Sequence, residues 1–263
     1  MKVFVAGHRG MLGHVAARYL SERGFDVVTS TARYDARPDN ALLRDIRESG
    51  ASWVVNALGR IKQKCANPEQ LFAGNTLFPL HLRATLLPGQ RLIHASTDCV
   101  FSGKTGRYSV ATTPDPSDDY GLSKWLGERV AEAGRAYVIR TSVIGPECST
   151  ASGLMSWFLG QHGAVNGFVN HQWNGVTTLE WSKMCVELMT GQYTPPAPLF
   201  HAGADGVVSK YELLKYIADA WEHRVTINPV EADTAIDRSL ALTLTRPPLP
   251  QQLTELRQWY QAR

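Results

Sequence analysis

Short apolar segments alternate with amphipathic segments over the first 145 residues of the chain. The apolar run from Lys2 to Ala6 is followed by glycines and then by apolar residues at helical spacing as far as Leu20, which predicts a strand, a turn and a helix. By the same pattern we expect strands at 25–29, 53–56, 91–95 and 136–140, and helices at 40–48, 67–87 (with a break at Pro79) and 118–133. The alternation predicts an α/β fold in which helices cover both faces of a doubly wound parallel sheet.

The pattern changes after Gly145. Loops that contain glycine and proline separate predicted helices near 154–161, 177–190 and 209–222, with a short strand near Leu199. We therefore expect a sheet domain over residues 1–145 and a small lobe over residues 146–263 that is interleaved with it. A cleft between the two parts is predicted at the carboxyl edge of the sheet.

Composition and charge narrow the class of protein. The chain has 263 residues with 44% hydrophobic and 19% charged content, and its 27 basic and 24 acidic residues are interspersed, which argues against a nucleic-acid binder. Its four cysteines have no paired short spacing, so we expect reduced thiols in a cytoplasmic protein rather than a metal site or disulfides. The sequence supports neither a signal peptide nor a membrane span.

Three glycines, Gly7, Gly10 and Gly13, form the turn between the first predicted strand and helix. A residue without a side chain lets the chain bend tightly and lets a pyrophosphate reach backbone N–H groups at the positive end of a helix. This context predicts a Rossmann-like, NAD(P)-binding domain over residues 1–145 and a substrate-binding lobe over residues 146–263. The residues of the turn expected to contact the cofactor are Gly7, Arg9, Gly10, Met11, Leu12 and Gly13.

The end of the second predicted strand favours NADP(H) over NAD(H). An acidic side chain there would bind the ribose 2′-hydroxyl of NAD, but the strand runs out through Thr31 to Arg33 instead. Arg9 and Arg33 could hold the 2′-phosphate of NADP, or each could be a solvated surface charge. The residues that end the third strand and are expected to touch the cofactor through backbone groups are Asn56, Ala57, Leu58 and Gly59.

Tyr120 and Lys124 lie one helical turn apart in a predicted helix. A nearby cation favours the phenolate, so we expect the lysine to lower the pKa of Tyr120 and to suit it to proton transfer. The run Ser96-Thr97-Asp98 follows a predicted strand, and Thr97 would present a hydroxyl beside that helix. Thr97 could then hydrogen-bond a reacting carbonyl oxygen while Tyr120 protonates it.

The segments STDCVFSGKTG, DYGLSKWLGE and RTSVIG resemble, in this order, those of dTDP-4-dehydrorhamnose reductases and related sugar-nucleotide reductases of the extended short-chain dehydrogenase/reductase family. The resemblance implies a catalytic trio of Thr97, Tyr120 and Lys124, with Tyr120 and Lys124 also contacting the cofactor. It further implies hydride transfer to the keto carbon of a nucleotide-linked 4-keto-6-deoxy sugar in polysaccharide biosynthesis, and it allows a homodimer.

The substrate side of the cleft is less defined by the sequence. Residues 165–178 are rich in amides and include an aromatic plane, which suits a hydroxylated ring or, as readily, an ordinary loop with a packed tryptophan. Arg140 and Arg238 could bind a diphosphate or form structural pairs. The residues expected to contact the substrate are Thr97, Asp98, Cys99, Val100, His171 and Trp173.

Two other functions stay open from the sequence. Some related epimerases and epimerase-reductases use a cysteine and a histidine as acid and base, and Cys99 with His171 or His162 could act in this way, although Cys99 could also be a small packed residue. A non-catalytic, NADP-binding regulatory subunit, as known within the same family, is the third possibility.

Overall fold

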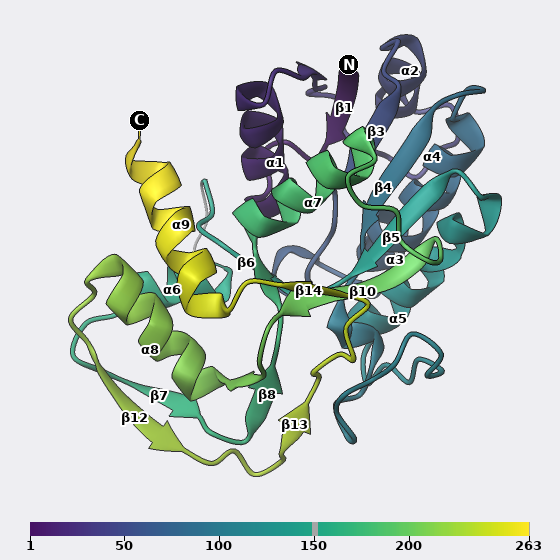
Figure 1. The fold of residues 1–263 in the computed structure, drawn as a ribbon. Coiled ribbons are helices and arrows are strands. Elements are labelled where there is room, and N and C mark those ends of the chain that lie inside the picture. Colours follow the sequence, from purple (N-terminus) through teal and green to yellow (C-terminus); the bar gives the residue numbers. More distant parts are fainter. Residues whose placement is uncertain (149–151, 263) are drawn as a thin grey trace.

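The computed structural model describes residues 1–148 and 152–262, and a seven-stranded parallel sheet forms its centre (Figure 1). The strand order is β14-β10-β5-β4-β3-β1-β2, so the chain runs outward from β1 to β2 and then returns past β1 to β3. The strands are β1 (Lys2–Ala6), β2 (Asp26–Val28), β3 (Trp53–Asn56), β4 (Arg91–Ala95), β5 (Ala136–Arg140), β10 (Leu199–Ala204) and β14 (Leu244–Arg246). This reversal between β1 and β3 opens a crevice at the carboxyl ends of the strands, where ligands bind in doubly wound sheets.

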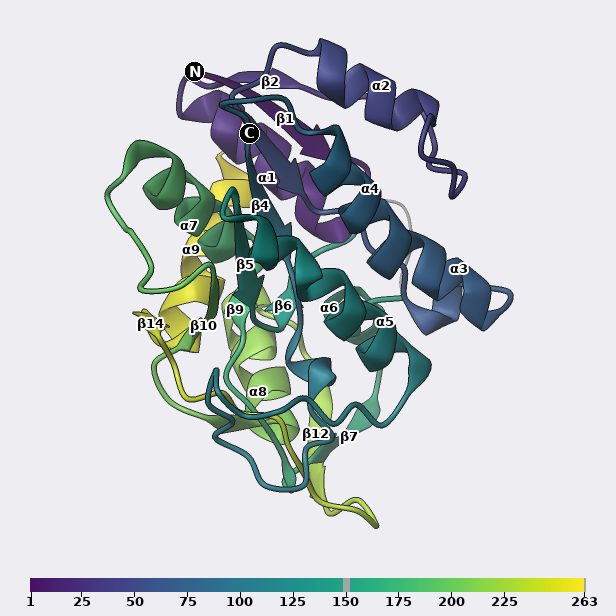
Figure 2. The same cartoon turned by 90° about the vertical axis from the view of Figure 1, so that its right-hand side faces the viewer.

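Helices cover both faces of the sheet, which confirms the predicted doubly wound α/β class (Figure 2). One layer contains α2 (Ala41–Glu48), α3 (Pro68–Phe72), α4 (Phe78–Thr85) and α5 (Asp119–Gly127), and the other contains α1 (Met11–Glu22) and α7 (Thr178–Thr190). Even-numbered residues of β1 such as Phe4 face the first layer, and odd-numbered ones such as Val3 face the second. The alternation of side chains along each strand therefore supplies two separate cores.

The predicted helix over 67–87 begins as expected, because Asn67 caps it by accepting from Gln70 N, but it does not break at Pro79. A π-helical turn, η2 (Ala73–Leu77), joins α3 to α4 instead, and Pro79 lies in the first turn of α4. The wider turn before the proline accommodates its missing N–H without ending the helix. The predicted helix over 118–133 likewise changes type, since α5 passes into the 3₁₀ helix η4 (Glu128–Ala133).

The chain beyond residue 145 forms a lobe at one end of the sheet but also contributes β10 and β14 to the sheet itself (Figure 1). The short strand β6 (Val143–Ile144) lies just before residue 145. The other elements beyond that residue are α6 (Leu154–Leu159), β7 (Ala164–Phe168), β8 (His171–Trp173), β9 (Val176–Thr177), β11 (Val208–Ser209), α8 (Lys210–Trp221), β12 (Thr226–Val230), β13 (Ile236–Asp237) and α9 (Leu249–Gln261). The sequence did not lead us to predict α9, the two-stranded sheet β12–β7 or the three-stranded sheet β11–β8–β13. The division of the chain at residue 145 into two functional parts stays a prediction.

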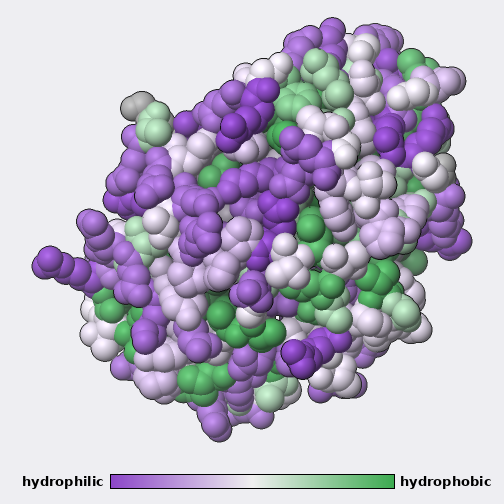
Figure 3. Space-filling view, in the orientation of Figure 1, coloured by the Kyte–Doolittle hydropathy of each residue, from purple (hydrophilic) through white to green (hydrophobic). Residues whose placement is uncertain are grey.

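The molecular surface is mostly hydrophilic on the face shown in Figure 3, with hydrophobic side chains in small separate groups. No helix within the described ranges is both long and apolar enough to cross a membrane.

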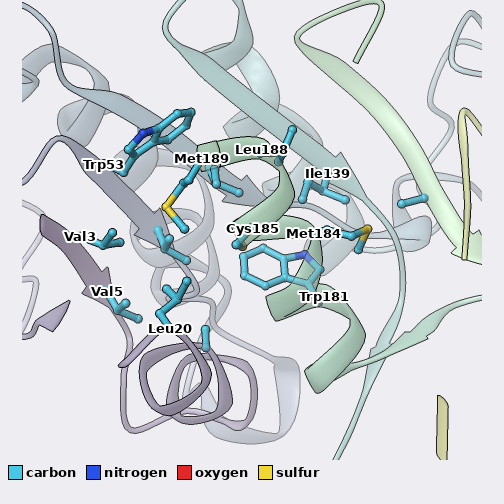
Figure 4. Packing of buried hydrophobic residues seen from close by; sticks show 14 of the residues in the cluster. Val3, Val5, Leu20, Trp53, Ile139, Trp181, Met184, Cys185, Leu188 and Met189 are labelled. Atoms are coloured by element: carbon cyan, nitrogen blue, oxygen red, sulfur yellow. The ribbon is translucent and has the colours of Figure 1, made fainter. Parts of the chain in front are cut away.

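Trp181 of α7 fills the core on the α1 side of the sheet (Figure 4). It is fully buried and packs in one cluster with Val5 of β1, Leu20 of α1 and Ile139 of β5. Because α7 comes from the second part of the chain, this core ties the lobe to the nucleotide side of the sheet. Shared packing, rather than a linker alone, therefore fixes the lobe against the sheet.

Candidate active site

The glycine turn after β1 leaves no room for side chains. Gly7 has a φ of +87°, and a Cβ on it would lie 2.7 Å from Leu58 N. A Cβ on Gly13 would lie 2.1 Å from the Gly7 carbonyl oxygen, which itself accepts a hydrogen bond from Gly10 N at 2.8 Å. The turn thus packs backbone on backbone, and α1 starts beside it with no side-chain cap on its first amides.

A cavity of about 740 Å³ opens in front of this turn. Eight of the predicted cofactor residues line it: Gly7, Arg9, Gly10, Thr31, Arg33, Ala57, Leu58 and Gly59. Its lining also includes residues that the sequence analysis did not single out, among them His8, Ser30, Arg60, Lys64, Gln70 and Gly74. Arg60 and Lys64 follow β3 in a loop that carries no recognisable motif, so only the fold brings them to the cavity.

The other predicted cofactor residues support the cavity without lining it. Asn56 is fully buried, where its Oδ1 accepts from Leu58 N at 3.1 Å and its Nδ2 contacts His94 Nδ1 at 2.9 Å. Gly13 lies beneath the turn, and Leu12 packs against the core. Contact of Asn56, Leu12 and Gly13 with the cofactor through their backbone groups stays a prediction. Met11, Tyr120 and Lys124 are also absent from this lining.

Positive charge dominates the cavity. Arg9, Arg33, Arg60 and Lys64 all line it. Its acidic residue, Asp35, accepts hydrogen bonds from Arg37 and Asn40, which lower the pKa of its carboxyl to about 2. Lys64 Nζ reaches across to Glu147 Oε1 at 2.8 Å and so links the loop after β3 to the second part of the chain. A cavity with this charge is suited to a ligand that carries several phosphates.

Thr97 and Tyr120 meet at the carboxyl end of β4, as the sequence analysis predicted. Thr97 caps the short 3₁₀ helix η3 (Asp98–Val100): its hydroxyl accepts from Cys99 N at 3.1 Å and donates to Asp98 Oδ1 at 3.1 Å. Burial raises the pKa of Tyr120, the nearby Cys99 adds to this effect, and a hydrogen bond with Thr97 opposes it. The structure therefore gathers Thr97, Asp98, Cys99 and Tyr120 into one cluster, to which we refer as the hydroxyl cluster.

The expected lowering of the Tyr120 pKa by Lys124 is wrong for this structure. Burial of the phenol outweighs other influences and raises that pKa. Lys124 is 5% exposed, and its ammonium donates a hydrogen bond to the backbone oxygen of Ala95. Burial lowers the pKa of Lys124 to about 8, with Glu128 opposing the shift. A lysine near its midpoint at physiological pH is common at catalytic sites.

Cys99 is poorly suited to act as a base. Burial, followed by the charge of Asp98, raises the pKa of its thiol to about 12, so the sulfur stays protonated near neutral pH. Of the two histidines considered as its partner, His162 is exposed, and His171 Nε2 lies 3.1 Å from the Thr234 oxygen while its ring stacks near Phe168. These observations favour a packing role for Cys99.

The amide-rich segment over 165–178 forms most of the short strands β7, β8 and β9 rather than a loop, and its tryptophan is packed, which was one of the alternatives that the sequence left open. Trp173 is 2% exposed and belongs to the core of the lobe, so it offers no free aromatic plane to a substrate. Asn174 uses both amide atoms on Leu240, with hydrogen bonds of 2.9 Å each, and Gln172 donates to the Val169 oxygen. The polar atoms of this segment hold the fold together.

Burial corrects the expectation for Val100 and decides between the two alternatives for Arg140. The Val100 side chain is fully buried with Phe101 and Tyr108, and its carbonyl accepts from Asp115 N, so a substrate contact through Val100 is not supported. Arg140 pairs with Glu128 at 2.6 and 2.7 Å, and both side chains are 4% exposed. Arg140 is therefore structural, since a buried guanidinium needs a fixed partner.

Comparison with known proteins gives consistent results. The family model described as RmlD substrate binding domain matches residues 1–262. The spore coat polysaccharide biosynthesis protein SpsK of Bacillus subtilis is 27% identical over 242 residues, 83% of this chain and 78% of that protein. The dTDP-4-dehydrorhamnose reductase of Mycobacterium tuberculosis is 26% identical over 221 residues, 80% of this chain and 72% of that protein. The structure of dTDP-4-dehydrorhamnose reductase from Bacillus anthracis in complex with NADP matches with a TM-score of 0.81 at 18% identity, over 97% of this chain and 96% of that one.

Proposed function

The chain belongs to the family described as the RmlD substrate binding domain, and we propose that it uses NADPH to reduce the keto group of a nucleotide-linked 4-keto-6-deoxy sugar. Its relatives and structural neighbours include dTDP-4-dehydrorhamnose reductases, one of which was solved in complex with NADP. The observation that carries the proposal is the meeting of Thr97 and Tyr120 in the hydroxyl cluster. The name of the Bacillus subtilis relative supports a role in polysaccharide biosynthesis.

The cavity before the glycine turn fits NADP(H). Its volume lies in the range of small-molecule sites, the missing Cβ atoms at Gly7 and Gly13 let the turn stay tight, and Arg9 and Arg33 are placed to hold a 2′-phosphate. When bound, NADPH supplies the hydride. Lys124 would hold the nicotinamide ribose, as the family resemblance implies.

Tyr120 serves as the proton donor in this proposal. Its raised pKa keeps the phenol protonated at neutral pH, so it can donate to the carbonyl oxygen as the hydride reaches the carbon. Thr97 orients the same oxygen by donating its hydroxyl proton, which it otherwise donates to Asp98. Lys124 carries its charge below pH about 8, because burial lowers the pKa of its ammonium.

The test is reduction of 4-keto-6-deoxy sugar nucleotides, followed by the absorbance of NADPH. We expect Tyr120→Phe to lower kcat by about 10²–10⁴-fold while leaving NADPH affinity unchanged. Tyr137→Phe is the matched control, because that phenol donates to no group of the hydroxyl cluster and lies beside Arg91 instead. Wild-type protein that binds NADPH but reduces no sugar in a broad panel, with Tyr120→Phe behaving identically, would favour a regulatory subunit.

An epimerase, or an epimerase-reductase, is the second candidate function. It is favoured by the position of Cys99, which lies close enough to Tyr120 to raise the pKa of the phenol. Solvent deuterium that enters the sugar without cofactor turnover, and stops entering in Cys99→Ala, would support it. The high pKa of the thiol makes us expect no such exchange.

We also expect a cytoplasmic protein and allow a homodimer.

A further inference from the structure

Lys210 is the first residue of α8 and carries a charge into the interior of the lobe. Its N-terminal neighbour, Ser209, caps α8 with a complete capping box and pairs in β11 with Gln172 of β8. This arrangement sets the Lys210 ammonium 5.1 Å from the ring centre of the buried Trp173. Capping and strand pairing therefore fix where this lysine points.

A chain of contacts links the start of α8 to the hydroxyl cluster. Ser209 pairs with Gln172, whose backbone oxygen accepts from Arg238 N at 3.3 Å, and Arg238 Nε donates to the oxygen of Phe101, three residues after Asp98. The charge of Lys210 interacts with Asp98 and Cys99 of that cluster, and burial lowers the pKa of Lys210. Within the described part of the chain, no hydrogen bond or ion pair engages the Lys210 ammonium; its contact is the face of Trp173. An ammonium held in this way is ready to donate to a ligand, because nearby protein acceptors do not take its protons.

Asp98 provides the complementary acceptor. Its carboxyl is 5% exposed and accepts hydrogen bonds from Thr97 and Cys99. The second cation near it, Arg238, is already engaged, since its Nε donates to the Phe101 oxygen at 3.0 Å. In the described residues the charges of Asp98 and Lys210 interact without forming an ion pair, so that the lysine remains an uncommitted donor.

We propose that Lys210 and Asp98 together bind the hydroxyl group on the carbon next to the carbonyl that is reduced. A hydroxyl both donates and accepts, so it satisfies the carboxylate and the ammonium at once. A carboxylate substituent would suit Lys210 but would be repelled by Asp98. In a 4-keto-6-deoxy hexose the neighbouring carbon that carries a hydroxyl is C3, because C5 carries the methyl group and the ring oxygen.

The hydrogen bond between Thr97 and Asp98 connects the Lys210–Asp98 pair with the reduction of the carbonyl group. Thr97 donates its proton to Asp98 in the structure, and it must release Asp98 in order to donate to the carbonyl oxygen. The C3 hydroxyl can then take its place as the donor to Asp98. Lys210 is thus a specificity residue that favours α-hydroxy ketones over their deoxy analogues, an inference that rests on the proposed reductase function.

The experiment compares kcat/KM for a nucleotide-linked 4-keto-6-deoxyhexose with that for its 3-deoxy analogue, in wild-type protein and in Lys210→Met. We expect the wild type to prefer the 3-hydroxy sugar by about 10–100-fold, the range for a hydrogen bond to a charged group. Lys210→Met should reduce this preference by about tenfold, almost entirely through the 3-hydroxy sugar, while Lys210→Arg should retain part of it.

Lys215→Met is the matched control, because Lys215 lies on the same helix, is exposed, and also faces an aromatic ring, that of Tyr211 at 5.5 Å. It should leave the preference unchanged. An equal loss with both sugars in Lys210→Met, or an unchanged ratio, would overturn the role of Lys210 while leaving the reductase intact. If the wild type reduces neither sugar, the proposed function fails and this inference fails with it. If Lys210→Met does not fold, the ratio measured in Lys210→Arg decides.

Discussion

The two sides of the cleft are built in different ways. On the cofactor side, the glycine turn, the segment around Arg33 and the segment around Leu58 each follow directly after a strand of the same sheet. On the substrate side, the contacts join residues far apart in sequence: Asn174 holds Leu240 across 66 residues, and Arg238 holds Phe101 across 137.

Because of this difference, we expect amino-acid substitutions to alter the substrate side more readily than the cofactor side. The cofactor side depends mainly on a local motif, a strand followed by a glycine turn, which forms together with the sheet. The substrate side depends on how loops of the lobe pack on one another, so one substitution at a position such as Lys210 alters what the cleft presents without disturbing the sheet. Four experiments below test this contrast.

The largest effect is expected for Gly13→Ala, which should disrupt the cofactor side. The new Cβ would lie 2.1 Å from Gly7 O, so the turn must move. We expect NADPH affinity to fall more than about a hundredfold and the free energy of unfolding to fall by about 3 kcal/mol, measured by fluorescence titration and by denaturant unfolding. In Gly10→Ala, where the closest contact is 3.3 Å, the loss of stability should stay below about 1 kcal/mol.

Lys124→Met tests the buried lysine that the proposed function places between the cofactor and the substrate. Folding lowers the pKa of this lysine from 10.5 to about 8, which disfavours the ammonium by up to about 3 kcal/mol at pH 7. The unfolded chain holds more protons between these two pKa values, so wild-type stability should rise with pH in that window. The variant should therefore be inactive. Its free energy of unfolding should exceed that of wild type at pH 7, and this difference should shrink as the pH rises from 8 to above 10. A stability difference that does not depend on pH would contradict the assignment.

Asn174→Ala should weaken the substrate side alone. It leaves the buried N–H and C=O of Leu240 without partners, which should cost about 2 kcal/mol of unfolding free energy. We expect KM for the sugar nucleotide to rise and the NADPH dissociation constant to stay the same. Asn166→Ala is the control, since Asn166 is exposed and its contact with Asn228 is 3.5 Å long. An equal loss of NADPH affinity in Asn174→Ala would show that the two sides are coupled.

Arg33→Ala should produce the smallest effect, confined to one phosphate. We expect NADPH affinity to fall about tenfold, or about 1.4 kcal/mol, and NADH affinity to change little, because NADH lacks the 2′-phosphate. Arg23→Ala, an exposed arginine next to Tyr19, serves as the control. Equal losses for both cofactors would refute the assignment of Arg33 to the 2′-phosphate.

Several features were readable from local patterns. The five strands predicted over the first 145 residues all form, Asn67 caps its helix, and Thr97 and Tyr120 meet as their motifs indicated. The helix α9 also carried a signal, because Leu249, Leu253 and Leu256 recur at helical spacing and are buried, although the sequence analysis did not use it. Local periodicity sufficed for these elements because burial on one face determines them.

The short strands of the lobe could not be predicted in the same way. β13 has two residues, pairs with β8 some sixty positions earlier in the chain, and shows no alternation of its own. The pKa of Tyr120 was mispredicted for a related reason: spacing placed a cation one turn away, whereas burial and the hydrogen bond from Lys124 to Ala95 are properties of the folded site.

The sequence by itself determined the first five strands of the sheet and the glycine turn, because each depends on residues close together in the chain. The catalytic trio of Thr97, Tyr120 and Lys124, which the family resemblance implies, stays a prediction. Tertiary structure alone decided that Trp173 is buried, that Arg140 pairs with Glu128, and that the charges of Lys210 and Asp98 interact. These positions depend on contacts between segments whose separation in sequence carries no periodic signal. Packing of the lobe against the sheet therefore decides which polar groups remain available to a ligand.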